Sequence, residues 1–205
     1  MQSNSGLLRC LKVPFLYDLF QGVVGANAFR RRIIRNHVRA RPGDKVIDIG
    51  CGPARVLQSL PDVEYLGLDI HPGYIAFARR TYGAKGTFVV GDTRSLRGDT
   101  RFKDANIVLA IAVLHHLDDE EVGDCIRFAY DALKRGGRLI CHDACWIPNQ
   151  GMLSKCIMSH DRGRNIRTEQ QYRQLAGKIF QNVHAWVDTK PLRIPYVTVV
   201  LECEK

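Results

Sequence analysis

One stretch constrains the fold more than any other: residues 45–55, which read Lys-Val-Ile-Asp-Ile-Gly-Cys-Gly-Pro-Ala-Arg. The apolar run predicts a buried strand over 45–49, and Gly50 and Gly52 predict a tight turn before a helix near 54–60. A glycine turn removes side chains where the backbone must approach a ligand, and it directs the N–H groups of the next helix at that ligand. The stretch therefore predicts the first βα unit of an open sheet, with a binding site where the strand ends.

An acidic residue at the end of the next predicted strand indicates which kind of ligand binds. Asp69 closes the run Tyr65-Leu-Gly-Leu-Asp and lies nineteen residues after Gly50 (69 − 50). At that spacing an acidic side chain at the tip of the next strand meets the hydroxyls of a ribose. The alternative is a loop aspartate that caps the following helix. We favour the ribose interpretation, which predicts a nucleoside-like ligand across two strand ends.

The charges near the turn argue against a dinucleotide. A nicotinamide-binding turn needs a third glycine, and here Arg55 stands in that place. Asp48, two residues before Gly50, would repel a pyrophosphate but attract a sulfonium or an α-ammonium group. A dehydrogenase on a similar sheet stays an unfavoured alternative, which a titration with NADH would test.

At these residues the sequence resembles the class I S-adenosylmethionine-dependent methyltransferases, and it is most similar to the branch with the ubiquinone/menaquinone-type C-methyltransferases. The resemblance spans about residues 43–146. It implies a Rossmann-like α/β fold: a seven-stranded sheet with a parallel core, a C-terminal antiparallel hairpin and helices on both faces. It also implies S-adenosyl-L-methionine as the cofactor, with S-adenosyl-L-homocysteine as the product.

The resemblance assigns cofactor contacts at four strand ends. They are Asp48, Gly50, Cys51, Gly52, Asp69, Ile70, Asp92, Thr93, Ala110 and Ile111. The first four would hold the methionine half, the next two the ribose and the following two the adenine, while the last two line the site. Cys51 is expected to be a small filler rather than a nucleophile. Asp92 has an ordinary strand-end turn as its alternative.

No catalytic set is obvious, because methyl transfer depends largely on positioning. The candidates are His115 after the fourth strand, His142 and Asp143 on the fifth, and Tyr17 near the N-terminus. Adjacent strand residues face opposite sides, so at most one of His142 and Asp143 points into the pocket. The alternatives are a structural or wall role for the histidines and a core role for Tyr17, which with Asp18 matches a pocket-facing pair of the family. No metal site is predicted.

The acceptor is expected to be a small-molecule or lipid-like compound, and Arg162 and Arg164 could clamp an acidic one unless they pair with nearby aspartates. An RNA-directed enzyme is the alternative, because residues 1–42 carry eight lysines and arginines against only Asp18, and the whole chain has a formal charge of +9. We favour a solvated helix face for these cations, since Phe29 and the apolar positions after it form the opposite stripe and no aromatic residues interleave with the arginines. A non-enzymatic cofactor-binding protein also stays open.

The remaining elements follow from apolar periodicity and turn residues. Further strands are predicted at 64–69, 86–91, 105–111 and 137–144, with a hairpin from 182–189 and 196–202. Helices are predicted at 14–24, 27–39, 72–82 and 119–134, the last ending in a glycine cap at 135–137. The chain is expected to be one domain: a helical cap (1–42), a cofactor-binding core (43–146) and an acceptor-side segment with the hairpin (147–205).

The cysteines and the hydropathy predict a cytoplasmic protein. The seven cysteines lack the spacing of metal ligands and are expected to be free thiols in a reducing compartment. No apolar run approaches the length of a membrane span, and no secretory signal is recognised at the N-terminus. The sequence predicts no oligomeric state.

Overall fold

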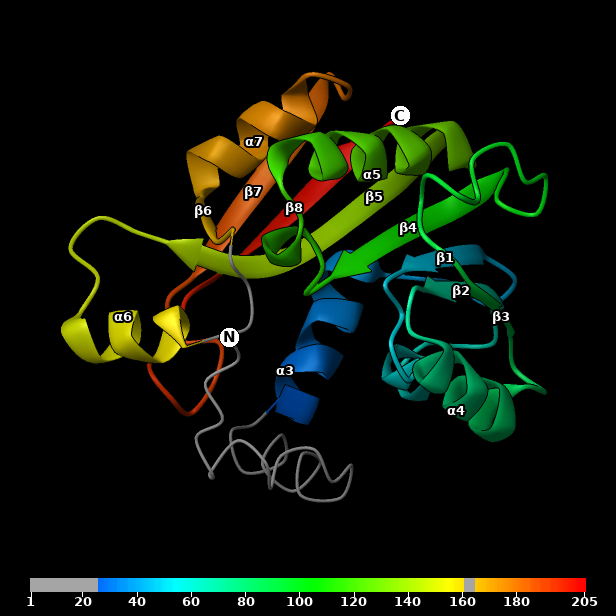
Figure 1. The fold of residues 1–205 in the computed structure, drawn as a ribbon, viewed down its shortest axis with the longest axis horizontal. Coiled ribbons are helices and arrows are strands. Elements are labelled where there is room, and N and C mark those ends of the chain that lie inside the picture. The colour runs from blue at the N-terminus through cyan, green and yellow to red at the C-terminus, as the bar shows by residue number, and fades with distance from the viewer. Residues whose placement is uncertain (1–25, 161–164) are drawn as a thin grey trace, which may run out of the picture.

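A computed structural model describes residues 26–160 and 165–205. A twisted sheet runs through these residues in the order β3-β2-β1-β4-β5-β8-β7, and a two-residue strand, β6, pairs with the end of β5 (Figure 1). The strands are β1 (Lys45–Ile49), β2 (Glu64–Asp69), β3 (Thr87–Val90), β4 (Ala105–Ile111), β5 (Leu133–Trp146), β6 (Arg167–Thr168), β7 (Asn182–Asp188) and β8 (Thr198–Glu204). Strands β1 to β5 are parallel, and β8 is antiparallel to both β5 and β7. The parallel core and the closing antiparallel hairpin are therefore confirmed.

Helices cover both faces of this sheet, as expected. They are α3 (Ala26–Ile33), the π-helix η1 (Ile34–Val38), the short 3₁₀ helices η2 (Arg55–Gln58) and η3 (Leu114–His116), α4 (Pro72–Tyr82), α5 (Asp119–Ala132), α6 (Met152–Ser159) and α7 (Glu169–Gly177). Figure 1 shows α5 and α7 over one face and α3 and α4 over the other. The predicted helix at 14–24 lies outside the described residues.

Local sequence signals set the starts of the main helices. Asp118 and Glu121 form a reciprocal capping box at the start of α5, which satisfies two backbone N–H groups. Thr168 and Gln171 do the same for α7. Pro72 lies in the first turn of α4, where its missing N–H costs no hydrogen bond.

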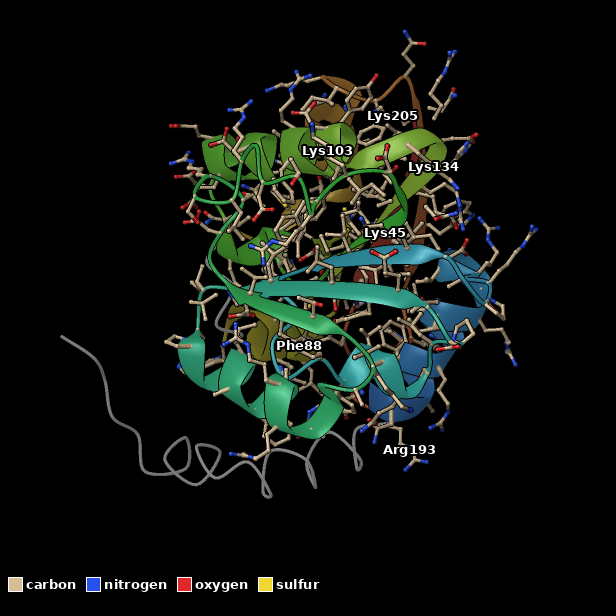
Figure 2. All side chains as sticks on the ribbon, turned by 90° about the vertical axis from the view of Figure 1, so that its right-hand side faces the viewer. Lys45, Phe88, Lys103, Lys134, Arg193 and Lys205 are labelled. Carbon is tan, nitrogen blue, oxygen red and sulfur yellow. The ribbon has the colours of Figure 1, made fainter. Side chains whose placement is uncertain are left out.

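The apolar side chains form one cluster on each face of the sheet. Ile47 and Leu68 belong to the cluster under α5 and α7. Val46 belongs to the cluster under α3 and α4, which also contains Phe88 of β3 and Ile75 of α4 (Figure 2). Because side chains alternate along a strand, Asp48 lies on the same face as Val46. The face that α3 and α4 cover therefore carries the first candidate cofactor residue.

Two predictions about helix ends are wrong. The helix expected near 54–60 is only the four-residue η2, because Ala54 has a left-handed backbone (φ +54°) and Pro61 follows closely. A helix of only four residues does not provide an N-terminus that could bind a ligand. Helix α5 ends at Ala132 without a glycine cap, and β5 begins at once.

A lysine takes the place of the expected glycine cap. Lys205 Nζ donates to the carbonyls of Tyr130 and Leu133, both at 2.7 Å, so a cation lies at the negative end of α5 (Figure 2). Gly136, with φ +72°, lies instead in an irregular stretch of β5. At Gly137 a Cβ would come within 2.8 Å of the carbonyl oxygen of Ala105, so glycine allows β5 to pass close to β4.

Among the described residues, no helix is both long and apolar enough to cross a bilayer. The same residues hold no group of three or more histidine, cysteine or acidic side chains placed to bind a metal ion.

Candidate functional site

Backbone hydrogen bonds join the carboxyl ends of the strands into one continuous edge. They run from Cys51 N to Leu68 O (2.9 Å), from Gly91 N to Asp69 O (3.0 Å) and from Ala112 N to His142 O (2.7 Å). The ends of β1 to β5 therefore lie side by side, and residues predicted at separate strand ends come together. In open α/β sheets this edge is where ligands bind.

The turn after β1 needs both glycines, for different reasons. Gly50 has φ +64°, and a Cβ there would lie 2.7 Å from Cγ2 of Val113 in the turn after β4. Gly52 has φ +53° with open space around it. Its N–H donates to Asp69 Oδ2 at 2.8 Å, so the first two strand ends are in direct contact.

Asp48 is a buried carboxylate whose charge no cation compensates. Its side chain is 4% exposed and accepts a hydrogen bond from the hydroxyl of Tyr65. Burial raises the pKa of Asp48 from 3.8 to about 7; the Tyr65 hydroxyl opposes this shift and the nearby charge of Asp69 adds to it. None of the ion pairs among the described residues involves Asp48. A bound sulfonium or ammonium would fit such a group.

Asp69 is held in place by the backbone, and Ile70 beside it is exposed. The second carboxylate oxygen of Asp69, Oδ1, accepts the N–H of His71 at 2.8 Å. A carboxylate oxygen has two lone pairs, so each can still accept a ribose hydroxyl. The side chain of Ile70 is 72% exposed, which leaves an apolar surface beside the carboxylate. A ribose and a flat base together match this pair of surfaces.

The third and fourth strand ends agree less closely with the cofactor prediction. Asp92 Oδ1 accepts the N–H groups of Ser95 (2.7 Å) and Arg94 (3.1 Å), so it closes its own turn. Those bonds, chiefly with Ser95, lower the pKa of Asp92. The neighbouring Thr93 is half-buried. Ala110 is fully buried in the cluster under α5, whereas Ile111 packs against the cluster on the Asp48 face.

His115 is paired with Asp143, which the sequence did not predict. Asp143 Oδ1 accepts the backbone N–H of His115 at 3.1 Å and lies 2.6 Å from its Nδ1. Both side chains are buried, and burial raises the pKa of Asp143 while His115 opposes the shift. The contact places the ring proton on Nδ1, which makes Nε2 the basic nitrogen. Such a pair can hold an imidazole in one tautomer.

His142 faces the opposite side of β5, as the alternation predicted, and packs against the ring of Phe29 with centroids 4.8 Å apart. Burial, together with the positive fields of His115, His37 and Arg32, lowers the pKa of His142 to about 3. Its Nε2 is buried and has no hydrogen-bond partner within residues 26–160 and 165–205. The side chains of His142 and Asp143 therefore lie on different faces of β5 and do not pair with each other.

Two further residues of the site gave no sequence signal. Thr198 is 3% exposed, and its Oγ1 also lacks a hydrogen-bond partner in the part of the chain that the structure describes. In the β5–β8 register Thr198 pairs with Ala144 next to the His142–Val200 pair, so it lies diagonally from His142 on one face, with Cα atoms about 7–8 Å apart. Two buried, unpartnered polar groups therefore lie close together.

Arg167 is the other unpredicted residue, and it fixes the turn that carries His115. Its guanidinium, nearly buried, bonds Asp119 Oδ1 (2.7 and 2.9 Å) and the carbonyls of Leu114 and Leu117. One side chain thus joins β6 to the start of α5. The candidates Tyr17, Asp18, Arg162 and Arg164 lie outside the described residues.

Comparisons with known proteins agree with this fold. Residues 46–137 match a family model described as a methyltransferase domain. The chain is 29% identical over 121 residues to a Saccharomyces cerevisiae tRNA (carboxymethyluridine(34)-5-O)-methyltransferase, covering 58% of the chain and 42% of that protein. It is 28% identical over 142 residues to phosphoethanolamine N-methyltransferase 3 of Arabidopsis thaliana, covering 66% and 28%. The chain thus spans less than half the length of either curated relative.

The fold also matches solved structures. A TehB-like S-adenosylmethionine-dependent methyltransferase from Corynebacterium glutamicum superposes with a TM-score of 0.62, at 17% identity, over 94% of this chain and 97% of that one. At this identity the likeness concerns the fold.

Proposed function

We propose that the chain carries a class I S-adenosylmethionine-dependent methyltransferase domain and transfers the methyl group of S-adenosyl-L-methionine to a small-molecule or lipid-like acceptor. One observation above all supports this: the ends of β1 and β2 bring two carboxylates and a bare glycine turn into contact. Asp48 supplies a buried negative charge and Asp69 supplies oxygens for hydroxyl groups. When bound, the cofactor supplies an electrophilic methyl group on a positively charged sulfur.

The residues of β1, β2 and β3 bind and orient the cofactor in this proposal. Asp48 stabilises positive charge in the methionine half, and the open backbone around Gly52 admits it. Asp69 is already fixed by two backbone donors, so it accepts ribose hydroxyls with little further loss of side-chain entropy. Asp92 and Thr93 lie at the adenine end, with Ile70 as the apolar neighbour.

The acceptor lies toward β5 and β8. In-line displacement requires the accepting atom about 3–3.5 Å from the methyl carbon. Ile111 of β4 is paired with His142 of β5, so the acceptor side is next to the cofactor side along the edge. His142 and Thr198 would hydrogen-bond the acceptor from one face of β5. His115, which Asp143 holds on the other face, follows β4 at the carboxyl edge and would take the acceptor's proton from there. Because the first two side chains are buried, a small or slender acceptor suits them better than a bulky one.

Finer points of the same proposal rest on the sequence. The run Val46–Gly52 supports the ubiquinone/menaquinone-type branch. The division into a cap (1–42), a core (43–146) and an acceptor-side segment (147–205) is retained. The described cysteines are free, with five of the six buried, which supports a reducing, cytoplasmic location.

An RNA acceptor is the second candidate. The Saccharomyces cerevisiae relative is named for a tRNA, and α3 and η1 carry a dense run of arginines. Transfer of labelled methyl groups from S-adenosylmethionine to purified tRNA, compared with transfer to a lipid and small-molecule extract, would decide between the two acceptors.

Calorimetry tests cofactor binding without knowledge of the acceptor. We expect S-adenosylhomocysteine to bind the protein, Asp69→Ala to weaken binding at least tenfold, and Asp99→Ala to leave it unchanged. Asp99 pairs with Arg101 in a loop before β4. Asp99→Ala therefore removes one carboxylate away from the site and serves as the matched control. The proposal fails if neither the cofactor nor its product binds at millimolar concentration.

A further inference from the structure

The arginine-rich helical segment lies against the antiparallel hairpin. Residues 26–41 contain six arginines and no acidic residue. Two of these arginines contact the hairpin: Arg32 pairs with Asp188 of β7, and Arg39 pairs with Glu202 of β8 at 2.5 Å. Among the described residues, two carboxylates of the hairpin thus contact this arginine-rich segment, and Glu202 also contacts His37 and Arg138.

The fold adds an aromatic side chain that the linear sequence places far away. Trp186 of β7 is 46% exposed, and its ring centroid lies 5.3 Å from that of His37 in η1 and 5.9 Å from that of His184. No aromatic residue interleaves with the arginines in the sequence, but the fold brings Trp186 next to the segment that carries them. An indole held by two imidazoles presents a firm, partly exposed flat surface.

Cations flank this indole on both sides along the strand. Asp188, which holds Arg32, follows Trp186 by two residues on the same face. His184 precedes it by two residues and pairs in register with Glu202, which holds Arg39. The two anchoring positions are four residues, or about 13 Å, apart, with the indole between them.

Two more arginines belong to the same helical segment. Arg31, near the end of α3, and Arg35, in η1, are four residues apart and so lie on one face of it. Arg31 and Arg35 are exposed. We call this surface the Trp186 patch, and define it by Arg31, Arg32, Arg35, His37, Arg39, His184 and Trp186.

We propose that the Trp186 patch binds a single-stranded polynucleotide. Single strands are held by an aromatic ring on which a base stacks, with cations along the backbone, and the patch provides both. A guanidinium has five N–H donors, so Arg32 and Arg39 can contact phosphate while they keep their carboxylate partners. The chain's formal charge of +9 favours approach of a polyanion. This binding goes beyond methyl transfer and does not depend on which acceptor the enzyme uses.

Fluorescence anisotropy with end-labelled twelve-residue oligouridylate and oligothymidylate, from 50 to 300 mM salt, tests the proposal on the whole chain without cofactor. We expect Trp186→Ala to weaken binding about 5- to 150-fold, and Trp186→Phe, which keeps a stacking ring, to restore most of it. Replacing Arg31 and Arg35 together by alanine should reduce the salt slope by about 1.4, which is 0.7 for each phosphate contact.

Arg127→Ala is the matched control, because Arg127 is an exposed arginine on α5, which covers the other face of the sheet (Figure 1). Comparison of the two oligomers distinguishes RNA from DNA. The proposal is overturned if neither oligomer binds at 50 mM salt, if Trp186→Ala and Trp186→Phe bind like the unchanged protein, or if Arg127→Ala has the same effect as the patch variants. Tighter binding to phosphatidylserine vesicles than to either oligomer, with the same dependence on Trp186, would assign the patch to a membrane surface and also overturn it.

Discussion

Asp48→Asn separates the stability of the domain from its affinity for the cofactor. Asparagine has nearly the same shape as aspartate, and its carbonyl oxygen can accept the hydrogen bond of the Tyr65 hydroxyl. The substitution therefore removes a buried charge with little change in packing. We expect the variant to be more stable than the unchanged protein above neutral pH in the absence of ligand, and to bind S-adenosylmethionine less tightly.

The size of the effect follows from the pKa of Asp48. A pKa of about 7 when folded, against 3.8 for the ordinary carboxyl, means that ionising Asp48 costs the folded state about 4 kcal/mol. Between these two values the folded state binds more protons than the unfolded chain, so stability falls as the pH rises. This contribution is complete below pH 3.8 and lost above pH 7. From pH 5 to pH 8 the unchanged protein should lose about 2.5 kcal/mol more than Asp48→Asn.

Urea unfolding at pH 5 and pH 8 measures this difference. Asp99→Asn is a useful control, since hydrogen bonds with Arg101 lower the pKa of Asp99, so this carboxyl stays ionised at both pH values and its loss should not alter the change in stability between them. Calorimetry at pH 8 should show S-adenosylmethionine binding weakened by about 1–2 kcal/mol, or about 5- to 30-fold. The reasoning is refuted if both proteins show the same pH dependence of stability, or if the variant is the less stable one at pH 8.

Four further substitutions probe the site. Gly50→Ala forces a Cβ against Val113, so we expect a lower melting temperature and much weaker binding of S-adenosylhomocysteine; Gly52→Ala, with open space, should show only the backbone strain of about 1–2 kcal/mol. His115→Gln should lower kcat by about 10²-fold or more in a methyl-transfer assay with unchanged product affinity, and an unaltered kcat would remove the proton-accepting role. Arg167→Lys loses several buried hydrogen bonds, so urea unfolding should show about 2–4 kcal/mol less stability; a loss under about 1 kcal/mol would contradict this.

The parallel core was predictable because each of its strands is a short apolar run with a clear end. The strands at 45–49, 64–69 and 105–111 have the predicted bounds. The alternation of side chains along β5 also predicted that His142 and Asp143 face opposite sides. The pattern of apolar residues within one strand predicts its bounds and which side chains share a face. This prediction needs no knowledge of the neighbouring strands.

The partners of the site residues were not predictable, because they depend on the register between elements. Asp143 and His115 are 28 residues apart and meet only because the turn after β4 lies beside β5. The aromatic partner of the arginine segment likewise comes from the far end of the chain. The end of α5 was misread because Lys205, 73 residues after Ala132 (205 − 132), caps it in place of a neighbouring glycine.

The strand order has a consequence for redesign. The residues that we propose for the cofactor belong to β1, β2 and β3, whereas His142 and Thr198, proposed for the acceptor, belong to β5 and β8, and β4 separates the two groups. Mutant libraries that vary only His142 and Thr198 would sample new acceptors while the proposed cofactor-binding residues stay unchanged. With this strand order, the acceptor-binding positions can diversify without compensating changes at the cofactor-binding positions.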